Sequence, residues 1–511
     1  MNVEALIASL PIRAHRGDLC RKLTDVTSDS RQVTPGTLFV ALRGERFDGH
    51  DFLTEAWRRG AGALLVDAEF PPDRLPPGAT ALFVADPRGR LPDLARAFYG
   101  SPSKRIELIG ITGTNGKTTV AYLLEAIFRA AGIPVALLGT VAYRFGETSL
   151  PAPLTTPDIL TFHRLLRTFA DAGARTVVME VSSHALAMGR LEGTTFATAL
   201  FTNLSRDHLD FHGTLDAYFE AKARLFSGTF LEGGEHPSHA IVNLDDPRAG
   251  ALLGRLPTTV RPITYGLRQG GDVTAHAPHL TLDGFSAHLH SPWGAFPIRG
   301  HLIGAHNLSN ALAAAAVALC HGISPEAIQG GFAALRCVPG RLEAVRLPGK
   351  KIPLVLVDYA HTPDALVNVL AALSPFQRRI VTLFGCGGDR DRGKRPMMAK
   401  AAFQGSDFVV VTSDNPRTED PDQILADIRA GLDAIGAPAT PPHQPREKSY
   451  TIVPDRKRAI EVAIDAAGPD DIVLIAGKGH EDYQIVGREK RPFDDREVAR
   501  LTLAQWREKR P

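Results

Sequence analysis

The chain has 511 residues, too many for a single hydrophobic core, so we expect roughly two to four domains. Hydrophobic residues make up 44% of the sequence and charged residues 22%, which is typical of a water-soluble globular protein. Because 58 lysines and arginines nearly balance 56 aspartates and glutamates, the net charge of +2 gives no overall field that would attract nucleic acid or a membrane surface.

The first hundred residues contain short apolar runs separated by glycine and proline, such as TLFVAL (37–42) and GALLVD (62–67). We expect short strands there. The opening stretch MNVEALIASLP has an early acidic residue, Glu4, and no basic region ahead of a long apolar one, so it does not predict a signal peptide. Small and polar residues surround a proline in YGSPSKR (99–105), which indicates a linker and sets the first predicted domain at 1–103.

Over residues 104–336, apolar runs alternate with helical stretches; the runs are IELIGITG, VALLGT, TVVMEV, TALFTNL and HAIVNL. This alternation favours a parallel sheet with helices on both faces. The longest apolar run, 311–320, has about half the length that a bilayer-spanning helix needs. We therefore expect a second, α/β domain in a cytoplasmic protein.

The segment RCVPGRLE (336–343) marks a second boundary. The remainder, 337–511, repeats the alternation with PLVLVDYAH, RIVTLFGCGGDR, FVVVTSDNPR and DIVLIAGKGHE. In both later regions the apolar runs end in glycine or in a polar or charged residue. Because ligands of open α/β sheets bind beyond the carboxyl ends of the strands, we expect the functional site at these positions. The four scattered cysteines form no CxxC pair and predict neither a disulfide framework nor a zinc site.

A phosphate-binding loop is the strongest single motif. In GITGTNGKTTVAYLLEAIF (110–128), an apolar strand runs into a glycine-rich turn that opens an amphipathic helix. The backbone amides of such a loop and helix start cradle phosphate oxygens. Lys117 would reach the β- and γ-phosphates, and the Thr118 hydroxyl would bind Mg²⁺. The alternative is a glycine-rich helix start without a ligand.

Candidate metal ligands follow the next two strands. Glu180 comes just after TVVM, and His208, Asp210, His212 and Lys222 lie within NLSRDHLDFHGTLDAYFEAKARLF (203–226). Glutamate and histidine suit a hard or borderline cation that shares phosphate oxygens. The alternative is that Glu180 caps a helix, that the histidines are loop residues, and that Lys222 belongs to a solvated helix face.

Nine segments resemble, in order and spacing, those of the Mur ligases: GTNGKTT, MEVSSHAL, HLDFHGTLDAYFEAKARLF, GAHNLSNALAA, VPGRLE, DYAHTPDAL, FGCGGDRDRGKRPMM, DNPR and AGKGHEDYQ. With TSDSRQVTPGTLFVALRGERFDGHDF near the N-terminus, the resemblance covers almost the whole chain. It implies an α/β protein of three domains: an N-terminal domain for a UDP sugar, a central P-loop ATPase-like parallel sheet, and a C-terminal Rossmann-like domain for an amino acid. It also implies a ligase of peptidoglycan precursor synthesis that uses ATP and Mg²⁺.

The resemblance assigns the ATP site to the phosphate loop and to three later residues, of which Asn307 contacts adenine, Asp358 the ribose and Arg341 a phosphate. Asn310 is structural. The implied ATP-binding residues are Gly113, Thr114, Asn115, Gly116, Lys117, Thr118, Thr119, Asn307, Arg341 and Asp358. The implied catalytic residues are Lys117, Thr118, Glu180, His208 and Lys222, and the last four also form the implied metal site. Lys222 falls where these ligases carry a carbamylated lysine, which is an anion.

The resemblance places two further substrates. The residues implied for UDP-N-acetylmuramoyl-L-alanyl-D-glutamate are Ser28, Ser30, Glu45, Arg46, Phe47, Thr155, Thr156, Ser182, Met188 and Arg190. Position 188 is methionine where some relatives carry glutamine. The residues implied for the incoming amino acid are Arg390, Asp414, Asn415, Pro416, Arg417, Gly477 and Glu481.

The tetrapeptide DNPR (414–417) indicates which amino acid is added. Diaminopimelate differs from lysine at its far end, where it carries a carboxylate beside the ammonium. The planar guanidinium of Arg417 can grip that carboxylate with two hydrogen bonds, and Asp414 and Asn415 can take the ammonium. The expected reaction therefore adds meso-2,6-diaminopimelate to the D-glutamate of the nucleotide substrate through an acyl phosphate.

Three alternatives remain at this stage. A lysine-adding sister ligase is disfavoured by Arg417, and a folylpolyglutamate synthetase would lack the N-terminal module and DNPR. A binding or scaffold protein that has lost catalysis would show substitutions at Lys117, Glu180, His208 or Lys222, and none is seen. We expect small-molecule substrates only, no nucleic acid or membrane partner, and a monomer.

Overall fold

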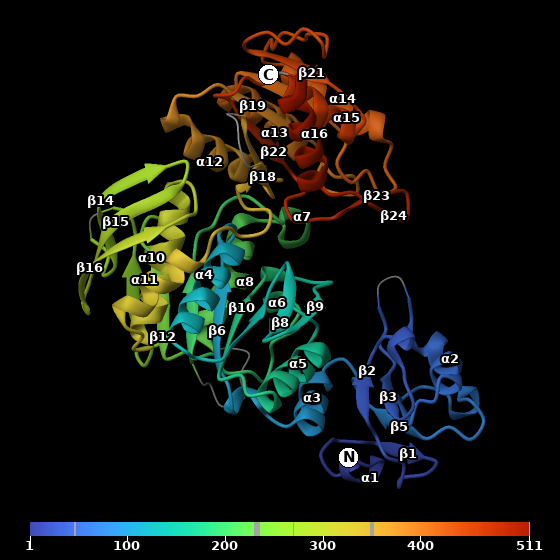
Figure 1. Cartoon of the computed structure of the whole chain (residues 1–511). Coiled ribbons are helices and arrows are strands. Elements are labelled where there is room, and N and C mark those ends of the chain that lie inside the picture. The colour runs from blue at the N-terminus through green and yellow to red at the C-terminus, as the bar shows by residue number, and fades with distance from the viewer. Residues whose placement is uncertain (45–46, 229–235, 269, 348–351, 510–511) are drawn as a thin grey trace.

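The computed structural model describes residues 1–44, 47–228, 236–268, 270–347 and 352–509. Three α/β regions follow one another along the chain (Figure 1), which confirms the predicted fold class. Their main sheets lie within residues 14–84, 107–265 and 343–476. The proposed domain limits of 1–103, 104–336 and 337–511 therefore leave each main sheet whole.

The N-terminal sheet contains the strands expected at 37–42 and 62–67. Its order is β1-β5-β4-β3-β2, with β1 antiparallel to β5 and the other pairs parallel. The strands are β1 (Ala14–Arg16), β2 (Asp25–Thr27), β3 (Thr37–Val40), β4 (Ala63–Asp67) and β5 (Ala81–Val84); the helices are α1 (Val3–Ile7), α2 (Leu53–Arg58) and α3 (Leu91–Tyr99). The expected linker begins where α3 ends and contains a short 3₁₀ turn, Pro102–Lys104.

The central sheet has the order β13-β12-β11-β6-β10-β7-β8-β9. Six strands run parallel, as predicted, and β8 and β9 add an antiparallel hairpin at one edge. The strands are β6 (Glu107–Thr112), β7 (Val135–Leu138), β8 (Ala142–Phe145), β9 (Thr148–Pro151), β10 (Thr176–Glu180), β11 (Thr198–Phe201), β12 (His239–Asn243) and β13 (Arg261–Tyr265). The associated helices are α4 (Lys117–Ala130), α5 (Ile159–Asp171), α6 (Ser183–Ala187), α7 (Leu209–His212), α8 (Leu215–Ser227), α9 (Ala249–Leu253), α10 (Ala305–Cys320) and α11 (Pro325–Ala334).

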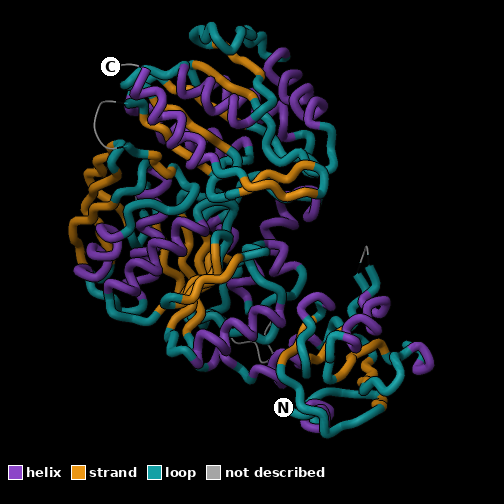
Figure 2. Tube along the Cα trace, turned by 45° about the vertical axis from the view of Figure 1, so that its right-hand side comes forward, coloured by secondary structure: helices purple, strands orange, loops and turns teal. Residues whose placement is uncertain are grey.

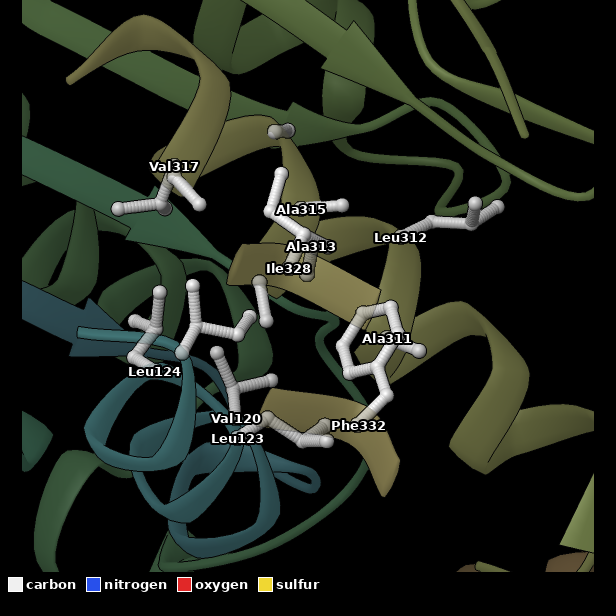
Figure 3. Packing of buried hydrophobic residues seen from close by; sticks show 14 of the residues in the cluster. Val120, Leu123, Leu124, Ala311, Leu312, Ala313, Ala315, Val317, Ile328 and Phe332 are labelled. Carbon is white, nitrogen blue, oxygen red and sulfur yellow. The ribbon is translucent and has the colours of Figure 1, made fainter. Parts of the chain in front are cut away.

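Side chains alternate along each strand, so every strand contributes to both faces of the central sheet. Helices cover and bury both faces. Val178 of β10 packs in a core with α4, α10 and α11, whereas Val177 packs on the opposite face with α5 and α8. Figure 3 shows the first of these cores. A β-carbon on Gly331 of α11 would lie 2.5 Å from the Cα atom of Ile127 in α4, so these helices meet at a glycine.

A three-stranded antiparallel sheet beside the central sheet was not predicted. It consists of β14 (Thr274–Thr281), β15 (Gly284–Ser291) and β16 (Gly294–Gly300). Along β15, Phe285 and Leu289 point into the core of α10 and α11, while His288 and His290 are exposed. Because buried and exposed residues alternate along the strand, one face of the sheet packs on the core and the other faces solvent.

The C-terminal sheet has the order β17-β18-β22-β19-β20-β21, with β17 antiparallel and the rest parallel. The strands are β17 (Glu343–Val345), β18 (Leu354–Asp358), β19 (Ile380–Phe384), β20 (Phe408–Val411), β21 (Ser449–Ile452) and β22 (Ile472–Ala476), with a separate hairpin of β23 (Tyr483–Val486) and β24 (Glu489–Pro492). The helices are α12 (Pro363–Leu373), α13 (Lys394–Gly405), α14 (Pro421–Asp433), α15 (Arg456–Asp465) and α16 (Asp495–Lys509). Figure 2 shows the strands of the central and C-terminal sheets between helices. Within the described ranges, no helix is both long and apolar enough to cross a bilayer.

Candidate functional site

The phosphate loop joins β6 to α4 and is shaped by its glycines. Gly113 has φ +144°, and a β-carbon there would lie 1.8 Å from Thr202 Oγ1, so no other residue fits without rearrangement. The hydroxyl of Thr202 donates to the carbonyl oxygen of Asn115 (2.6 Å), and the Asn115 amide donates to Asn203 Oδ1 (2.9 Å). The loop is therefore anchored to the end of the neighbouring strand β11.

Lys117, the first residue of α4, folds back onto this loop. Its Nζ donates to the carbonyl oxygens of Gly113 and Thr114, both at 2.8 Å. Burial lowers the pKa of Lys117 below its usual value. The ammonium is thus held over the concave side of the loop, where a phosphate would compete for it.

Glu180, the last residue of β10, is the buried acceptor at the centre of the site, with 1% of its surface exposed. Its Oε2 accepts from the hydroxyls of Thr118 (2.9 Å) and Thr140 (3.1 Å), and its Oε1 accepts from the Thr140 amide (2.8 Å). Glu180 does not cap a helix; Ser182 caps α6. A carboxylate beside a threonine hydroxyl is a donor set that suits Mg²⁺ when phosphate supplies the other oxygens. In the part of the chain that the structure describes, no group of three or more His, Cys, Asp and Glu residues is arranged to hold a metal alone.

Lys222 on α8 is buried, with 2% exposure, so a solvated helix face is excluded. Its Nζ donates to the Gly113 carbonyl (2.8 Å), the same oxygen that Lys117 contacts, and lies 4.4 Å from the ring centre of Tyr218. Burial and, next, the charge of Lys117 lower the pKa of Lys222 well below its usual value. The neutral, nucleophilic amine is therefore easier to form at Lys222 than at an ordinary lysine.

His208 and His212, the histidines of the same segment, lie at the two ends of α7 and contact neighbouring polar residues. His208 precedes α7 in the left-handed region (φ +54°), with its Nε2 3.4 Å from Asp207 Oδ2. Partial burial lowers the pKa of His208 below its usual value, although the carboxylate of Asp207 opposes this shift. The Nε2 atom of His212 lies 3.0 Å from Ser183 Oγ.

A cavity of about 430 Å³ brings the expected nucleotide residues together. Its wall contains Thr114, Asn115, Gly116, Lys117, Thr118, Thr119, Glu180, His208, Asn307, Arg341 and Asp358. Gly113 and Lys222 do not line this cavity; they contact each other, because Lys222 Nζ donates to the Gly113 carbonyl. Arg341 reaches across from the C-terminal region, and its Nη2 donates to Thr118 Oγ1 (3.1 Å). Asn310 donates to Asn307 Oδ1 (3.0 Å) and also lines this cavity, although the sequence assigned it a structural role only.

The residues expected around the muramoyl dipeptide form a second cluster, next to Glu180. The Thr156 hydroxyl donates to the Glu180 carbonyl (2.8 Å) and accepts from the Ser182 amide (3.0 Å). Arg190 donates to the Thr156 carbonyl (3.2 Å) and contacts Met188 Sδ (3.3 Å). Thr155 joins the cluster through Thr140, with their hydroxyl oxygens 3.1 Å apart.

The remaining residues of this predicted set belong to the N-terminal region. Ser28 is exposed and Ser30 is buried beside β2. Phe47 is 73% exposed, which is unusual for a phenylalanine and leaves its ring available for stacking. Glu45 and Arg46 lie outside the described residues.

A second cavity, also about 430 Å³, lies at the carboxyl ends of β19, β20 and β22. Its wall includes Arg390, Asp414, Asn415, Arg417, Gly477 and Glu481, six of the seven residues expected to hold the amino acid. The seventh, Pro416, is buried in the turn between them. Gly477 has φ +117°, and a β-carbon there would lie 2.6 Å from Asp414 Oδ2, so the glycine makes room for that carboxylate.

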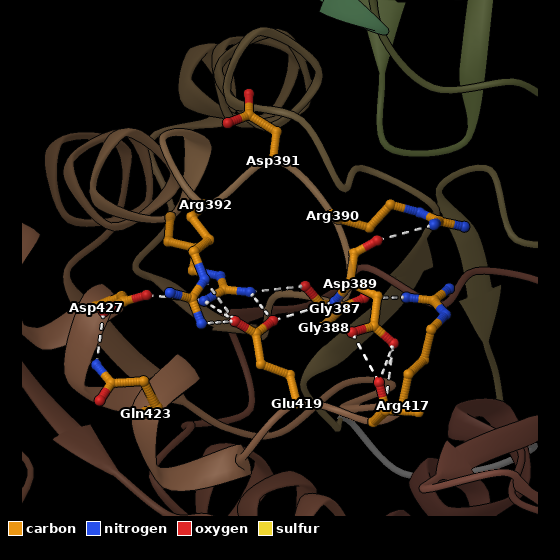
Figure 4. Close-up of polar contacts among 12 residues, drawn as sticks. Gly387, Gly388, Asp389, Arg390, Asp391, Arg392, Arg417, Glu419, Gln423 and Asp427 are labelled. Atoms are coloured by element: carbon orange, nitrogen blue, oxygen red, sulfur yellow. Dashed lines mark hydrogen bonds and ion pairs between the residues drawn. The ribbon is translucent and has the colours of Figure 1, made fainter. Parts of the chain in front are cut away.

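Figure 4 shows how the loops of this cavity are held together. The Nη1 of Arg417 donates to the Gly388 carbonyl (2.8 Å). Glu419 accepts from Arg392 (2.6 Å) and from the fully buried Arg395 (2.6 Å). These charge-assisted hydrogen bonds tie the loop before α13 and the start of α13 to the loop before α14.

The two cavities share part of their walls. Asp207 and His208 come from the central region, Tyr359 and His361 from the C-terminal region, and all four line both cavities. Arg390, Asp414 and Arg417 thus lie in a cavity that continues toward Lys117 and Glu180. Two charged substrates bound in these spaces would meet near His208 and His361.

Some residues of the site were not identified from the sequence. Thr140 holds Glu180, Asn203 anchors the phosphate loop, and His361 lines both cavities. All three follow the ends of apolar runs, so the rule about strand ends contained the signal. Lys478 belongs to the motif GKGHE, but the sequence did not predict that its side chain is buried.

Comparisons with known proteins agree with this geometry. Three family profiles match consecutive parts of the chain: Mur ligase family, catalytic domain over 22–99; Mur ligase middle domain over 111–318; and Mur ligase, glutamate ligase domain over 340–479. The UDP-N-acetylmuramoyl-L-alanyl-D-glutamate–2,6-diaminopimelate ligase of Geobacter metallireducens is 46% identical over 487 residues, 94% of each chain. The chain belongs to the Mur ligase family.

Further relatives of this Mur ligase carry the same name. The ligase of that name from Geobacillus thermodenitrificans is 43% identical over 510 residues, which is 99% of this chain and 100% of the relative. A solved structure of a ligase of that name is 34% identical, covers 99% of both chains and has a TM-score of 0.65.

Proposed function

We propose that this Mur ligase uses ATP to join meso-2,6-diaminopimelate to the D-glutamate of UDP-N-acetylmuramoyl-L-alanyl-D-glutamate. The observation that carries the proposal is the second cavity, in which two guanidinium groups, Arg390 and Arg417, lie with two carboxylates, Asp414 and Glu481. Such a set matches the zwitterionic end of diaminopimelate. The named relatives at 43–46% identity support the same substrates.

In the first step the D-glutamate carboxylate attacks the γ-phosphorus of ATP, which gives an acyl phosphate and ADP. Lys117 and the amides of the phosphate loop stabilise the transferring phosphoryl group, whose chemistry needs positioning and neutralisation of charge. Arg341, which contacts Thr118, adds a second positive charge at the phosphates. Asn307 and Asp358 would hold the adenine and the ribose.

Mg²⁺ would be held by Thr118 and Glu180 with His208 and Lys222 nearby, and it would neutralise phosphate charge. A lysine ammonium repels a cation, so Lys222 contributes only after its amine has bonded to the carbon of CO₂ and released a proton. The carbamate that results is an anion. The lowered pKa of Lys222 favours this reaction because the neutral amine is the reacting form.

In the second step the amine of diaminopimelate attacks the acyl carbon, loses a proton and displaces phosphate. Arg417 and Arg390 would bind the distal carboxylate, and Asp414 and Glu481 the distal ammonium. Lysine would leave the guanidinium of Arg417 without its carboxylate, which disfavours a lysine-adding ligase. A folylpolyglutamate synthetase is disfavoured because full-length relatives carry another name.

The muramoyl dipeptide would lie along Thr155, Thr156, Ser182, Met188 and Arg190, and the UDP end along the N-terminal region. We propose a cytoplasmic monomer that acts on small molecules, without a nucleic acid or membrane partner. The nearly balanced charge of +2 supports the part of this proposal that concerns nucleic acid and membrane partners.

The test is ATP-dependent incorporation of labelled amino acids into UDP-N-acetylmuramoyl-L-alanyl-D-glutamate, with meso-diaminopimelate and L-lysine offered in parallel. We expect a tripeptide product and one ADP per product with diaminopimelate, and little product with lysine. Equal use of lysine, or ADP release that does not depend on an amino acid, would refute the proposal.

A further inference from the structure

A buried lysine, Lys478, stands behind the amino-acid cavity and has no role in the function proposed above. It follows β22 and Gly477, and its side chain is 0% exposed. Burial of an ammonium is costly unless the charge is paired, and an apolar side chain usually stabilises such a position at least as well. A purely structural position therefore does not require a lysine.

The ammonium of Lys478 is paired with two residues of the cavity wall. Its Nζ lies 3.2 Å from Glu481 Oε2 and 3.2 Å from Asn415 Oδ1. Glu481 and Asn415 line the cavity, whereas Lys478 does not. The lysine thus acts on the cavity only through these two side chains.

The contacts of Asn415 leave its oxygen no capacity for a substrate. Oδ1 accepts from Lys478 and from the Ile485 amide (2.9 Å), which uses both lone pairs. Nδ2 donates to Glu481 Oε2 at 2.8 Å. Asn415 consequently cannot accept a hydrogen bond from an ammonium, contrary to the simplest interpretation of DNPR.

Glu481 is held at one oxygen only. Its Oε2 accepts hydrogen bonds from Asn415 Nδ2 and Lys478 Nζ. No described residue donates a hydrogen bond to Oε1. Oε1 is therefore left for a donor in the cavity. Two donors fix the carboxylate at Oε2, so Oε1 is presented in a constant position.

We propose that Lys478 is a positioning residue that, with Asn415, orients Glu481 to bind the distal ammonium of diaminopimelate. This inference rests on the proposed function and deepens it. The distal carboxylate is bound by the guanidinium groups of Arg390 and Arg417. The Lys478–Asn415–Glu481 group recognises the amine together with Asp414. Lys478 itself touches neither substrate.

The test compares diaminopimelate with 2-aminopimelate, which keeps the reacting amino acid end and the distal carboxylate but has hydrogen in place of the distal amine. Loss of a hydrogen bond to a charged group predicts that Lys478→Met lowers kcat/KM for diaminopimelate about 10- to 100-fold, mostly through KM. The same variant should change kcat/KM for 2-aminopimelate by less than about threefold and leave KM for ATP unchanged. A general loss of structure would lower both values together.

Lys457→Met, at an exposed position of α15, is the matched control and should behave as wild type with both amino acids. Lys478→Gln keeps a donor in the buried position and replaces the Met variant if that variant does not fold. Equal losses with both amino acids, or two variants that both fail to fold, would overturn the role of Lys478. A wild type that does not ligate diaminopimelate would instead refute the proposed function.

Discussion

Arg417 offers a quantitative test of how the cavity distinguishes diaminopimelate from lysine. Its guanidinium is half-buried and uses one N–H on the Gly388 carbonyl at 2.8 Å. A guanidinium has five N–H groups, so an edge remains for a carboxylate. Loss of one partner of a desolvated charge pair costs about 2–5 kcal/mol, and partial exposure of Arg417 places its contribution near the lower end, about 2–3 kcal/mol. Since 1.4 kcal/mol is a factor of ten, Arg417→Ala should lower kcat/KM for diaminopimelate about 30- to 150-fold.

The assay measures kcat/KM for diaminopimelate and lysine with wild type, Arg417→Ala and Arg417→Lys. The lysine variant should also fail, because one ammonium cannot make the two parallel hydrogen bonds of a guanidinium. Arg429→Ala, at an exposed position of α14, controls for the loss of one arginine. If wild type uses both amino acids equally, or if Arg417→Ala leaves diaminopimelate unaffected, Arg417 does not bind the distal carboxylate.

Three further outcomes are expected. Lys222→Ala should nearly abolish ligation because an anionic group near the phosphates is lost; short-chain carboxylic acids should restore part of it, and turnover at the wild-type rate would contradict the metal-site assignment. Hydrogen bonds from Arg395 lower the pKa of Glu419 from 4.5 to about 2, so its contribution to stability is present above about pH 4.5 and disappears as the pH falls toward 2. In urea unfolding, the difference between wild type and Glu419→Gln should therefore shrink over that range, and a constant difference would contradict the ion pair. Solution scattering should differ between the free and the fully liganded enzyme, because we expect the central and C-terminal regions to close around bound substrates; identical profiles would count against closure.

The parallel sheets were predictable because their strands are apolar on both faces. Runs such as 176–181 and 408–411 read as buried strands, and the polar residues after them mark the strand ends. The antiparallel sheet of β14, β15 and β16 escaped prediction because β14 and β15 mix histidine with alanine and leucine, and β16 is interrupted by glycine and proline. Such short amphipathic runs between helices are hard to separate from loops.

Side-chain contacts were less predictable than strand positions. The sequence indicated that Asn415 belongs to the amino-acid site, but not that its oxygen is occupied by Lys478 and Ile485. Those partners come from residues more than sixty positions away, after another strand. The helix pattern around Lys222 favoured a solvated face; the family resemblance implied a carbamylated lysine there, and the burial of the side chain is seen only in the structure.

The shared wall of the two cavities has a consequence for how the binding of the substrates is coupled. Asp207 and His208 approach from one region, and Tyr359 and His361 from the other. The wall of the amino-acid cavity is complete only when the central and C-terminal regions are in contact. A nucleotide that holds Arg341 against Thr118 therefore also stabilises the amino-acid cavity. Such coupling is reciprocal, so each ligand raises the affinity for the other. A bound nucleotide would therefore raise the affinity for diaminopimelate, and the space enclosed by both regions would leave little water to destroy an acyl phosphate.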